Sequence, residues 1–268
     1  MFKTRLTEMF GVETPICMGG MTGVGYGDLV AAVAEAGALG FITAHMFPSG
    51  QALFDEIERT RKMTSKPFGV NLTLLPSINP IPYDDYREAI IASGIKIVET
   101  AGRAPTDHLP RFKDNGVKVI HKCTSVRHSK KAEAIGCDAV SVDGFECGGH
   151  PGEDDVPNFI LLPRAAEELK IPFVASGGVA NGKQLAAALC MGADGVNMGT
   201  RFCVTQEAPI PMAFKEQMVA NDERQTDLIF RTLHNTARVM RNAVSQEVVQ
   251  IERAGGAKFE DVAHLVAR

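Results

Sequence analysis

The sequence predicts an α/β protein built as a closed (β/α)8 TIM barrel with an appended C-terminal helical segment. Eight short apolar runs alternate with amphipathic, helix-like segments along most of the chain. The runs show little internal alternation, as expected for parallel strands that are buried on both faces. A length of 268 residues is ordinary for a single α/β barrel. An open doubly wound sheet remains an alternative, because strand order cannot be read from sequence.

The expected strands are runs rich in Val, Ile and Phe. They are Pro15–Met18, Ala38–Thr43, Phe68–Leu72, Ile95–Val98, Val117–His121, Asp138–Val142, Pro172–Ser176 and Asp194–Met198. The expected helices between them are Asp28–Ala36, Gln51–Met63, Tyr83–Ser93, Pro105–Asn115, Thr124–Ile135, Leu161–Lys170 and Asn181–Met191. Asn181 is a suitable helix N-cap, and Gly37, Gly136 and Gly192 follow helix ends.

The chain divides into residues 1–204, the expected barrel, and residues 205–268, an expected helical extension packed on it. Candidate helices in the extension are Glu207–Ala220, Glu223–Leu233 and Ala237–Gln250. No linker rich in Gly, Ser or Pro separates the two parts, so we expect one domain with an appended segment. The extension is a candidate lid or oligomerisation element.

Composition and charge exclude several classes of protein. Hydrophobic residues make up 45% of the chain and charged ones 22%, which is typical of a globular protein. With 28 Lys and Arg against 32 Asp and Glu, no basic excess favours nucleic acid. No apolar run reaches the roughly 20 residues of a membrane span, and no secretory signal opens the chain. Six scattered cysteines indicate reduced thiols in a cytoplasmic protein, and no residue cluster has metal-ligand spacing.

Glycine-rich turns follow three of the expected strands. They are Gly19-Gly20-Met21 after the first, Ser176-Gly177-Gly178 after the seventh and Met198-Gly199-Thr200 after the eighth. The loops after strands seven and eight of such barrels commonly bind phosphate through backbone N–H groups. Each turn alone could be only a tight connection, but two on adjacent strands favour a phosphate site. No G-x-G-x-x-G pattern in the right context supports a Rossmann dinucleotide site.

The segment after the sixth strand contains the candidate catalytic residue. It runs from Asp143 to Gly152 and places His150 after Gly148 and Gly149. A histidine at the catalytic end of a barrel can act as a base or a hydrogen-bond donor near neutral pH. The alternative is a surface-loop histidine with no functional role. The neighbouring glycines argue against it, because they suggest that a ligand lies close to the backbone. Asp143 and Glu146 offer acceptors, whereas Cys147 is interpreted as a packing residue.

Polar residues also end the third and fifth strands. Asn71 and Thr73 lie in an apolar context and are expected to face a ligand. Only one of His121 and Lys122 can point into the barrel, because successive strand residues face opposite sides. Lys122 could hold negative charge on a cofactor ring; the alternative is a snorkelling surface lysine. Pro76, Pro80 and Pro82 form a rigid loop at the end where barrel sites lie.

With these residues identified, the sequence resembles the nitronate monooxygenase family, formerly the 2-nitropropane dioxygenases, which are FMN-containing (β/α)8 barrels. The similarity covers residues 15 to 202. It is carried by the segments Pro15–Met21, Gly69–Thr73, Gly144–Gly152, Pro172–Gly178 and Gly192–Phe202. Leu72–Pro76, Pro80–Tyr83, His121–Thr124 and His150–Asp155 are similar to the branch of bacterial NADH:quinone reductases. Related enoyl reductases share the Gly-Gly-His segment, so that motif alone does not choose an activity.

The resemblance implies a role for each matching residue. Ser176, Gly177, Gly178, Gly199 and Thr200 would hold the FMN phosphate. Gly19, Gly20, Met21, Asn71, Lys122, Asp143, Gly148, Gly149 and Met198 would line the rest of the cofactor. Thr73, Pro76, Pro80 and Pro82 would help to admit NADH. His150 would lie beside the reactive edge of the flavin and act on a quinone or a nitronate.

One departure from the family concerns the C-terminus. Family members usually continue for several tens of residues beyond the point where this sequence stops, through a loop that contains a tryptophan and a final helix. This chain has no Trp. The resemblance therefore implies a truncated C-terminal region, whose uncovered apolar face would favour a homodimer. Two other functions remain open: a flavin- or phosphate-binding barrel without turnover, and a sugar-phosphate isomerase or lyase with Lys122 as its catalytic residue.

Overall fold

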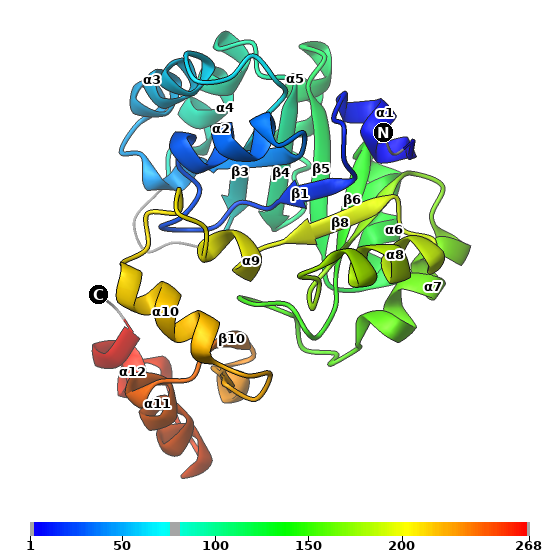
Figure 1. The fold of residues 1–268 in the computed structure, drawn as a ribbon. Helices are drawn as coiled ribbons and strands as arrows, with labels where there is room; N and C mark the ends of the chain where they lie inside the picture. Colours follow the sequence, from blue (N-terminus) through cyan, green and yellow to red (C-terminus); the bar gives the residue numbers. More distant parts are fainter. Residues whose placement is uncertain (1–2, 76–80, 267–268) are drawn as a thin grey trace.

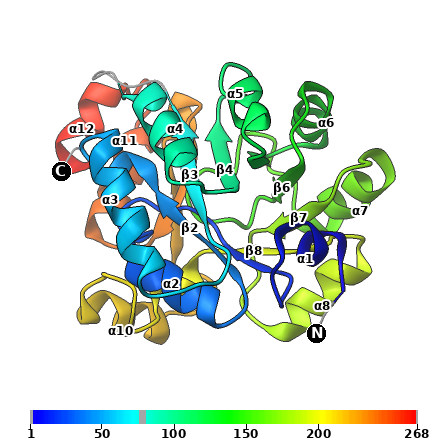
Figure 2. The same ribbon diagram turned by 90° about the horizontal axis from the view of Figure 1, so that it is seen from above.

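The computed structural model describes residues 3–75 and 81–266. Eight parallel strands form a closed barrel in which each strand pairs with the next and β8 pairs with β1. The strands are β1 Ile16–Met18, β2 Leu39–Thr43, β3 Gly69–Leu74, β4 Ile97–Gly102, β5 Lys118–Cys123, β6 Ala139–Asp143, β7 Phe173–Ser176 and β8 Gly195–Met198. Helices surround them (Figures 1 and 2). The predicted (β/α)8 barrel is confirmed, and the open sheet is excluded.

The helices between the strands agree with the predicted segments. They are α2 Gly27–Glu35, α3 Gly50–Arg61, α4 Tyr83–Ala92, α5 Leu109–Asp114, α6 Val126–Ile135, α7 Asn158–Glu168 and α8 Gly182–Cys190. The 3₁₀ helix η1 Ala44–Met46 and the short α9 Thr200–Cys203, which follows β8, were not predicted. Asn181 caps α8, as expected, by accepting from the N–H groups of Lys183 and Gln184. The helix α7 begins earlier than predicted, because the Glu146 carboxylate accepts from the N–H of Asn158 at its N-terminus.

The barrel interior is divided into an apolar layer and a polar layer. The apolar layer fills the end where the strands begin, and α1 (Arg5–Phe10) closes it with Leu6 and Phe10. Its strand residues are Cys17, Leu39, Phe41, Ile97, Ile120, Ala139 and Val174. One pleat further along, the inward positions become polar and remain buried, as at Asn71, Glu99 and Ser141. A larger apolar cluster lies outside the barrel, between the strands and the helices.

The C-terminal tail, which we define as residues 205–268, differs from the prediction. It contains α10 Met212–Ala220, β9 Thr226–Ile229, the 3₁₀ helix η2 Arg231–Leu233, β10 Ala237–Met240, α11 Ala243–Arg253 and α12 Phe259–Val266. The helix predicted at Glu223–Leu233 is wrong, and the one predicted from Ala237 begins only at Ala243. β9 and β10 form an antiparallel pair that includes Ile229 and Ala237, so pairing overrides helix propensity there. The tail lies to one side of the barrel (Figure 1).

We predict that His121 makes the fold sensitive to acid. Burial lowers the pKa of its ring from 6.5 to about 4, against the opposing effect of Thr100, whose hydroxyl lies 2.8 Å from Nδ1. The unfolded chain therefore binds more protons between these pH values, and stability is lost as pH falls from 6.5 towards 4. This loss is about 3 kcal/mol near pH 4. His121→Gln should remove this share of the pH dependence in urea unfolding curves. Parallel pH profiles for the two proteins would contradict the assignment.

Candidate active site

Polar side chains from several strands meet inside the barrel near the ends where the strands finish. These inward residues are Asn71 on β3, Glu99 on β4, Lys122 on β5, Ser141 and Asp143 on β6, Ser176 on β7 and Asn197 on β8. Lys122 is the inward member of its pair. His121 faces outward and contacts Thr100 of the neighbouring strand.

Glu99 lies at the centre of this polar layer. Its side chain is completely buried, and its Oε2 accepts from the backbone N–H of Gly20 at 2.8 Å and from Asn71 Nδ2 at 2.7 Å. Thr73 donates its hydroxyl to Asn71 Oδ1 at 2.8 Å, which turns the amide nitrogen of Asn71 towards Glu99. The carboxylate therefore joins the loop after β1 to the end of β3.

Asn197 extends the network to the opposite side of the barrel. Its Nδ2 lies 3.3 Å from Glu99 Oε1 and 3.2 Å from Ser141 Oγ. Ser141 in turn donates to Asp143 Oδ1 at 2.9 Å. Burial raises the pKa of Asp143, while Lys122, Ser176 and Ser141 oppose this shift. Asn71, Lys122, Asp143 and Ser176, which were predicted separately from sequence, thus belong to one site.

The ammonium group of Lys122 has no direct partner in this network. Burial by itself would lower the pKa of Lys122, but the nearby carboxylates of Glu99 and Asp143 outweigh it and raise the pKa. Within residues 3–75 and 81–266, no acceptor lies within hydrogen-bonding distance of Lys122 Nζ. The side chain is half-buried at the open end of the barrel. It therefore offers a positive charge to a ligand.

The loop after β1 lies against the network without room for side chains. A Cβ added at Gly20 would lie 2.2 Å from Asn71 Cβ, and one at Gly19 would lie 2.7 Å from Asn197 Oδ1. Met21 bonds through its backbone to the Thr43 hydroxyl, and its sulfur lies 3.4 Å from a Cβ placed on Gly199. Backbone thus forms one wall of the site, which lets a ligand approach closely.

The loops after β7 and β8 present free amide groups. Gly177 and Gly178 have φ of +99° and +70°, which glycine adopts without strain. Asn158 Nδ2 donates to the carbonyls of Ser176 and Gly177, so these oxygens face the protein. In the described part of the chain, the N–H groups of Gly178, Gly199 and Thr200 have no acceptor. This donor set suits a phosphate. Met198 precedes it and is buried.

His150 lies in an exposed loop that we call the His150 loop, residues 148–155. Desolvation lowers the pKa of His150, although Glu153 acts in the opposite direction, so the neutral ring is favoured near pH 7. Gly148 and Gly149 are also exposed. Burial raises the pKa of the Cys147 thiol to about 12, which agrees with a packing role. Glu146 caps α7 and is not available as the ligand acceptor that the sequence suggested.

Only part of the predicted proline loop can be placed. Pro76 and Pro80 lie outside the described residues. Pro82 precedes α4 and is half-buried, and Tyr83 after it donates its hydroxyl to Thr73 O at 2.8 Å. The end of the loop is therefore attached to β3 beside Asn71.

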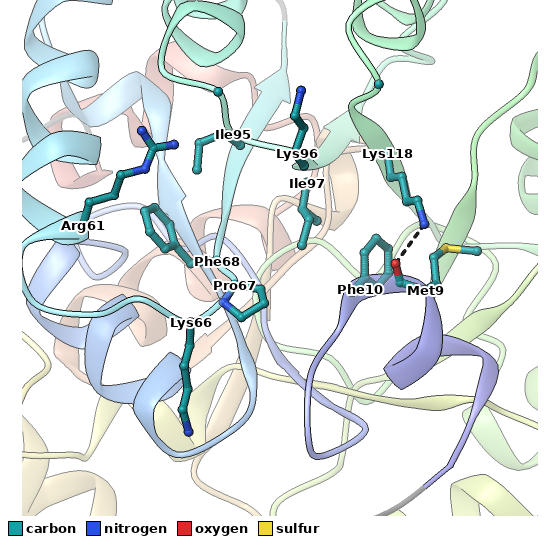
Figure 3. A pocket seen from close by; sticks show the side chains of 12 residues that line it. Met9, Phe10, Arg61, Lys66, Pro67, Phe68, Ile95, Lys96, Ile97 and Lys118 are labelled. Atoms are coloured by element: carbon teal, nitrogen blue, oxygen red, sulfur yellow. Dashed lines mark hydrogen bonds between the residues drawn. The ribbon is translucent and has the colours of Figure 1, made fainter.

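Two cavities lie away from these residues. One, of about 350 Å³, is at the opposite end of the barrel between α1 and the starts of β3, β4 and β5 (Figure 3). Its lysines are already engaged: Lys66 pairs with Glu13, and Lys96 and Lys118 donate to backbone carbonyls. The other, of about 490 Å³, lies between Tyr26, Arg59 and Glu207. Neither cavity is lined by residues of the polar network. We place the candidate active site at the network, because its polar side chains converge where the strands end and barrel sites lie.

Across residues 3–75 and 81–266, no group of three or more His, Cys, Asp and Glu side chains is arranged to hold a metal ion. No helix among these residues combines the length and the apolar character needed to cross a membrane.

Comparison with known proteins identifies the family. The profile of the nitronate monooxygenase family matches residues 3–267. The chain belongs to this family. Its fold is similar to that of FabK from Thermotoga maritima, with a TM-score of 0.89 and 35% sequence identity. The match covers 99% of this chain and 81% of that one.

Two curated relatives extend the comparison. A "(3aS,4S,5R,7aS)-5-hydroxy-7a-methyl-1-oxo-octahydro-1H-indene-4-carboxyl-CoA dehydrogenase" of Rhodococcus jostii is 38% identical over 84% of this chain. The chain spans only 62% of the length of that relative. A "Probable nitronate monooxygenase" of Staphylococcus aureus is 30% identical, over 93% of this chain and 81% of that protein.

We predict that Gly20→Ala destabilises the protein by about 1–3 kcal/mol, because the new methyl group would displace Asn71 from Glu99. Gly182→Ala is the matched control. A Cβ at Gly182 has no atom within 4 Å, and alanine favours the first turn of α8. Urea unfolding should show the loss in the first variant and none in the second. Equal stability of Gly20→Ala and the unmodified protein would contradict the packing described.

Proposed function

We propose that the protein is an FMN-dependent oxidoreductase with its active site at the polar network. The observation that carries the proposal is the ammonium group of Lys122, which is held beside two buried carboxylates without a direct partner among the described residues. It lies in the same barrel mouth as the free amides after β7 and β8. Membership in a family of flavin-dependent oxidoreductases supports the choice of cofactor.

The residues present fit an FMN molecule. The amides of Gly177, Gly178, Gly199 and Thr200 and the hydroxyl of Ser176 would hold its phosphate. Gly19, Gly20, Met21, Asn71, Lys122 and Asp143 would contact the ring and the ribityl chain, with Gly148, Gly149 and Met198 at the margin. When bound, FMN accepts a hydride from a reductant and passes electrons to an acceptor. Lys122 would favour the reduced, anionic ring.

His150 would act on the second substrate. A neutral imidazole can donate its N–H to a substrate oxygen on which negative charge develops. On a nitronate, the same ring would hold the substrate or accept a proton from it.

We propose NADH as the reductant and a quinone as the acceptor. The support is the similarity of Leu72–Pro76, Pro80–Tyr83 and His150–Asp155 to the NADH:quinone reductase branch. Reduction or oxidation of an acyl thioester is a second candidate. It is favoured by the 38% identical relative named as a CoA dehydrogenase and by the similarity to FabK, an enoyl reductase.

Visible spectra of the FMN-loaded protein under anaerobic conditions would distinguish these activities. NADH should bleach the flavin, and benzoquinone should restore its colour. Recovery with an enoyl-CoA and not with benzoquinone would favour the thioester reaction. Bleaching by a nitronate alone would make the protein a nitronate monooxygenase. A protein that does not take up FMN would overturn the proposal.

We predict that His150→Asn retains FMN and loses catalytic rate. A positioned acid or base contributes about 10²–10⁴-fold, so kcat should fall by about 10²-fold or more. FMN content, measured by absorbance, should remain unchanged because the loop lies outside the phosphate site. Full activity of this variant would show that His150 does not act in the reaction.

A further inference from the structure

The His150 loop is held by the C-terminal tail. Among the described residues, the hydrogen bonds that leave residues 148–155 all end on the tail. Two residues just before the loop are bonded to the barrel and its helices: Gly144 N donates to Ser176 O, and Glu146 accepts from Asn158 N. Phe145 between them accepts from Arg238 of the tail. The chain therefore leaves the barrel immediately before the candidate catalytic residue and is fixed again by a different part of the protein.

The first attachment is a short antiparallel bridge to β10. Gly149 N donates to Arg238 O at 3.0 Å, and Arg238 N donates to Gly149 O at 2.6 Å. Gly149 directly precedes His150 in the chain. The backbone of β10 thus fixes Gly149, and with it the position of the backbone from which the His150 side chain extends.

The side chain of Arg238 strengthens this attachment. Its Nη2 donates to Phe145 O at 3.0 Å, and its guanidinium carbon lies 4.9 Å from the centre of the Phe145 ring. Its Nη1 donates to Thr226 Oγ1 at 3.0 Å, which ties it to β9. Its Nε is buried and has no acceptor in the part of the chain that is described. Because such a donor costs free energy, stability alone does not explain an arginine here.

A second attachment lies on the far side of His150. The carboxylate of Glu153 accepts from the backbone N–H of Thr236 at 2.8 Å and from its hydroxyl at 2.7 Å. Thr236 is only 1% exposed, so the donor side of this contact is buried. Arg231 and Asp155 form an ion pair at 2.5 Å, but both are exposed and contribute less.

The tail has a hydrophobic core and hydrogen bonds of its own. Ile229, Ala237, Val248 and Val262 form a hydrophobic core separate from that of the barrel. Glu252 on α11, which is buried, accepts from the backbone N–H groups of Phe230 and Thr232. These bonds fix the connection between β9 and β10, which also carries Arg231 and Thr236.

We propose that β10 positions His150 for catalysis and that Arg238 is the positioning residue, acting through the imidazole and not on the substrate. This inference rests on the proposed function, in which His150 acts at the reacting atoms. It also implies that the tail is part of the active site rather than an accessory.

Arg238→Met tests the proposal, because it removes the guanidinium contacts and keeps the backbone bridge. Hydrogen exchange, measured on the protein with and without FMN, should become at least about tenfold faster in residues 148–155 and stay unchanged in the barrel strands. Arg241→Met is the matched control: Arg241 pairs with Asp227 within the same hairpin and does not contact the loop. It should leave exchange in the loop unchanged. Unaltered loop exchange in Arg238→Met would overturn the proposal.

Kinetics provide the second readout. Arg238→Met should lower kcat about tenfold while KM for NADH and FMN content change less than about threefold. In a His150→Asn background the same substitution should change kcat less than about twofold, because two residues that act through one group are not additive. An equal loss in both backgrounds would show that Arg238 acts independently of His150.

Thr236→Val covers the case in which Arg238→Met does not fold. It removes only the hydroxyl donor to Glu153 and should also speed exchange in the loop and lower kcat, each by about two- to fivefold. No change in either would count against the positioning role. If His150→Asn were fully active, the role of His150 in the proposed function would fail, and loop exchange alone would decide whether β10 holds the loop.

Discussion

The arrangement of the site depends on burying the carboxylate of Glu99 inside the barrel. Removing a charge from water costs several kcal/mol unless hydrogen bonds and an opposite charge offset it. Here Gly20, Asn71 and Asn197 supply donors, and Lys122 supplies the nearby charge. Because these partners come from the loop after β1 and from β3, β5 and β8, the buried carboxylate holds the ends of these strands together. It also leaves the ammonium of Lys122 facing the barrel mouth without a direct partner among the described residues.

His150, the proposed catalytic residue, is attached to this centre only indirectly. The polar network belongs to the barrel, whereas the His150 loop is bonded to the tail. The tail has a hydrophobic core of its own, so the barrel fixes the proposed cofactor site and the tail fixes the residue that would act on the substrate. Relatives that share the barrel but differ in the tail could therefore act on different substrates with the same cofactor chemistry.

The sequence was sufficient for the barrel because its strands are continuous apolar runs with clear helix-end signals between them. It also identified Asn71, Lys122 and Asp143, whose polar character stands out at strand ends. Glu99 was not predicted, because the apolar run ends at Val98 and the strand was expected to end there. The available signal was its spacing: Glu99 lies two residues after Ile97, so it points to the same inward face of the strand. The β9–β10 hairpin was not predicted, because each strand has only four residues and the connection between them has no Asn-Gly or Asp-Gly turn signal. The bridge from Arg238 to Gly149 could not be read from the sequence either, since its two residues are distant in the chain.

The most direct test of this account is the reduction potential of bound FMN in Lys122→Met. If the unpartnered ammonium stabilises the reduced, anionic ring by about 1.4 kcal/mol or more, the potential of the variant should be lower by about 30 mV or more for the two-electron couple. The unmodified protein and the Gly182→Ala variant should have equal potentials. An unchanged potential in Lys122→Met, with FMN still bound, would contradict the central role given to the polar network and its free charge.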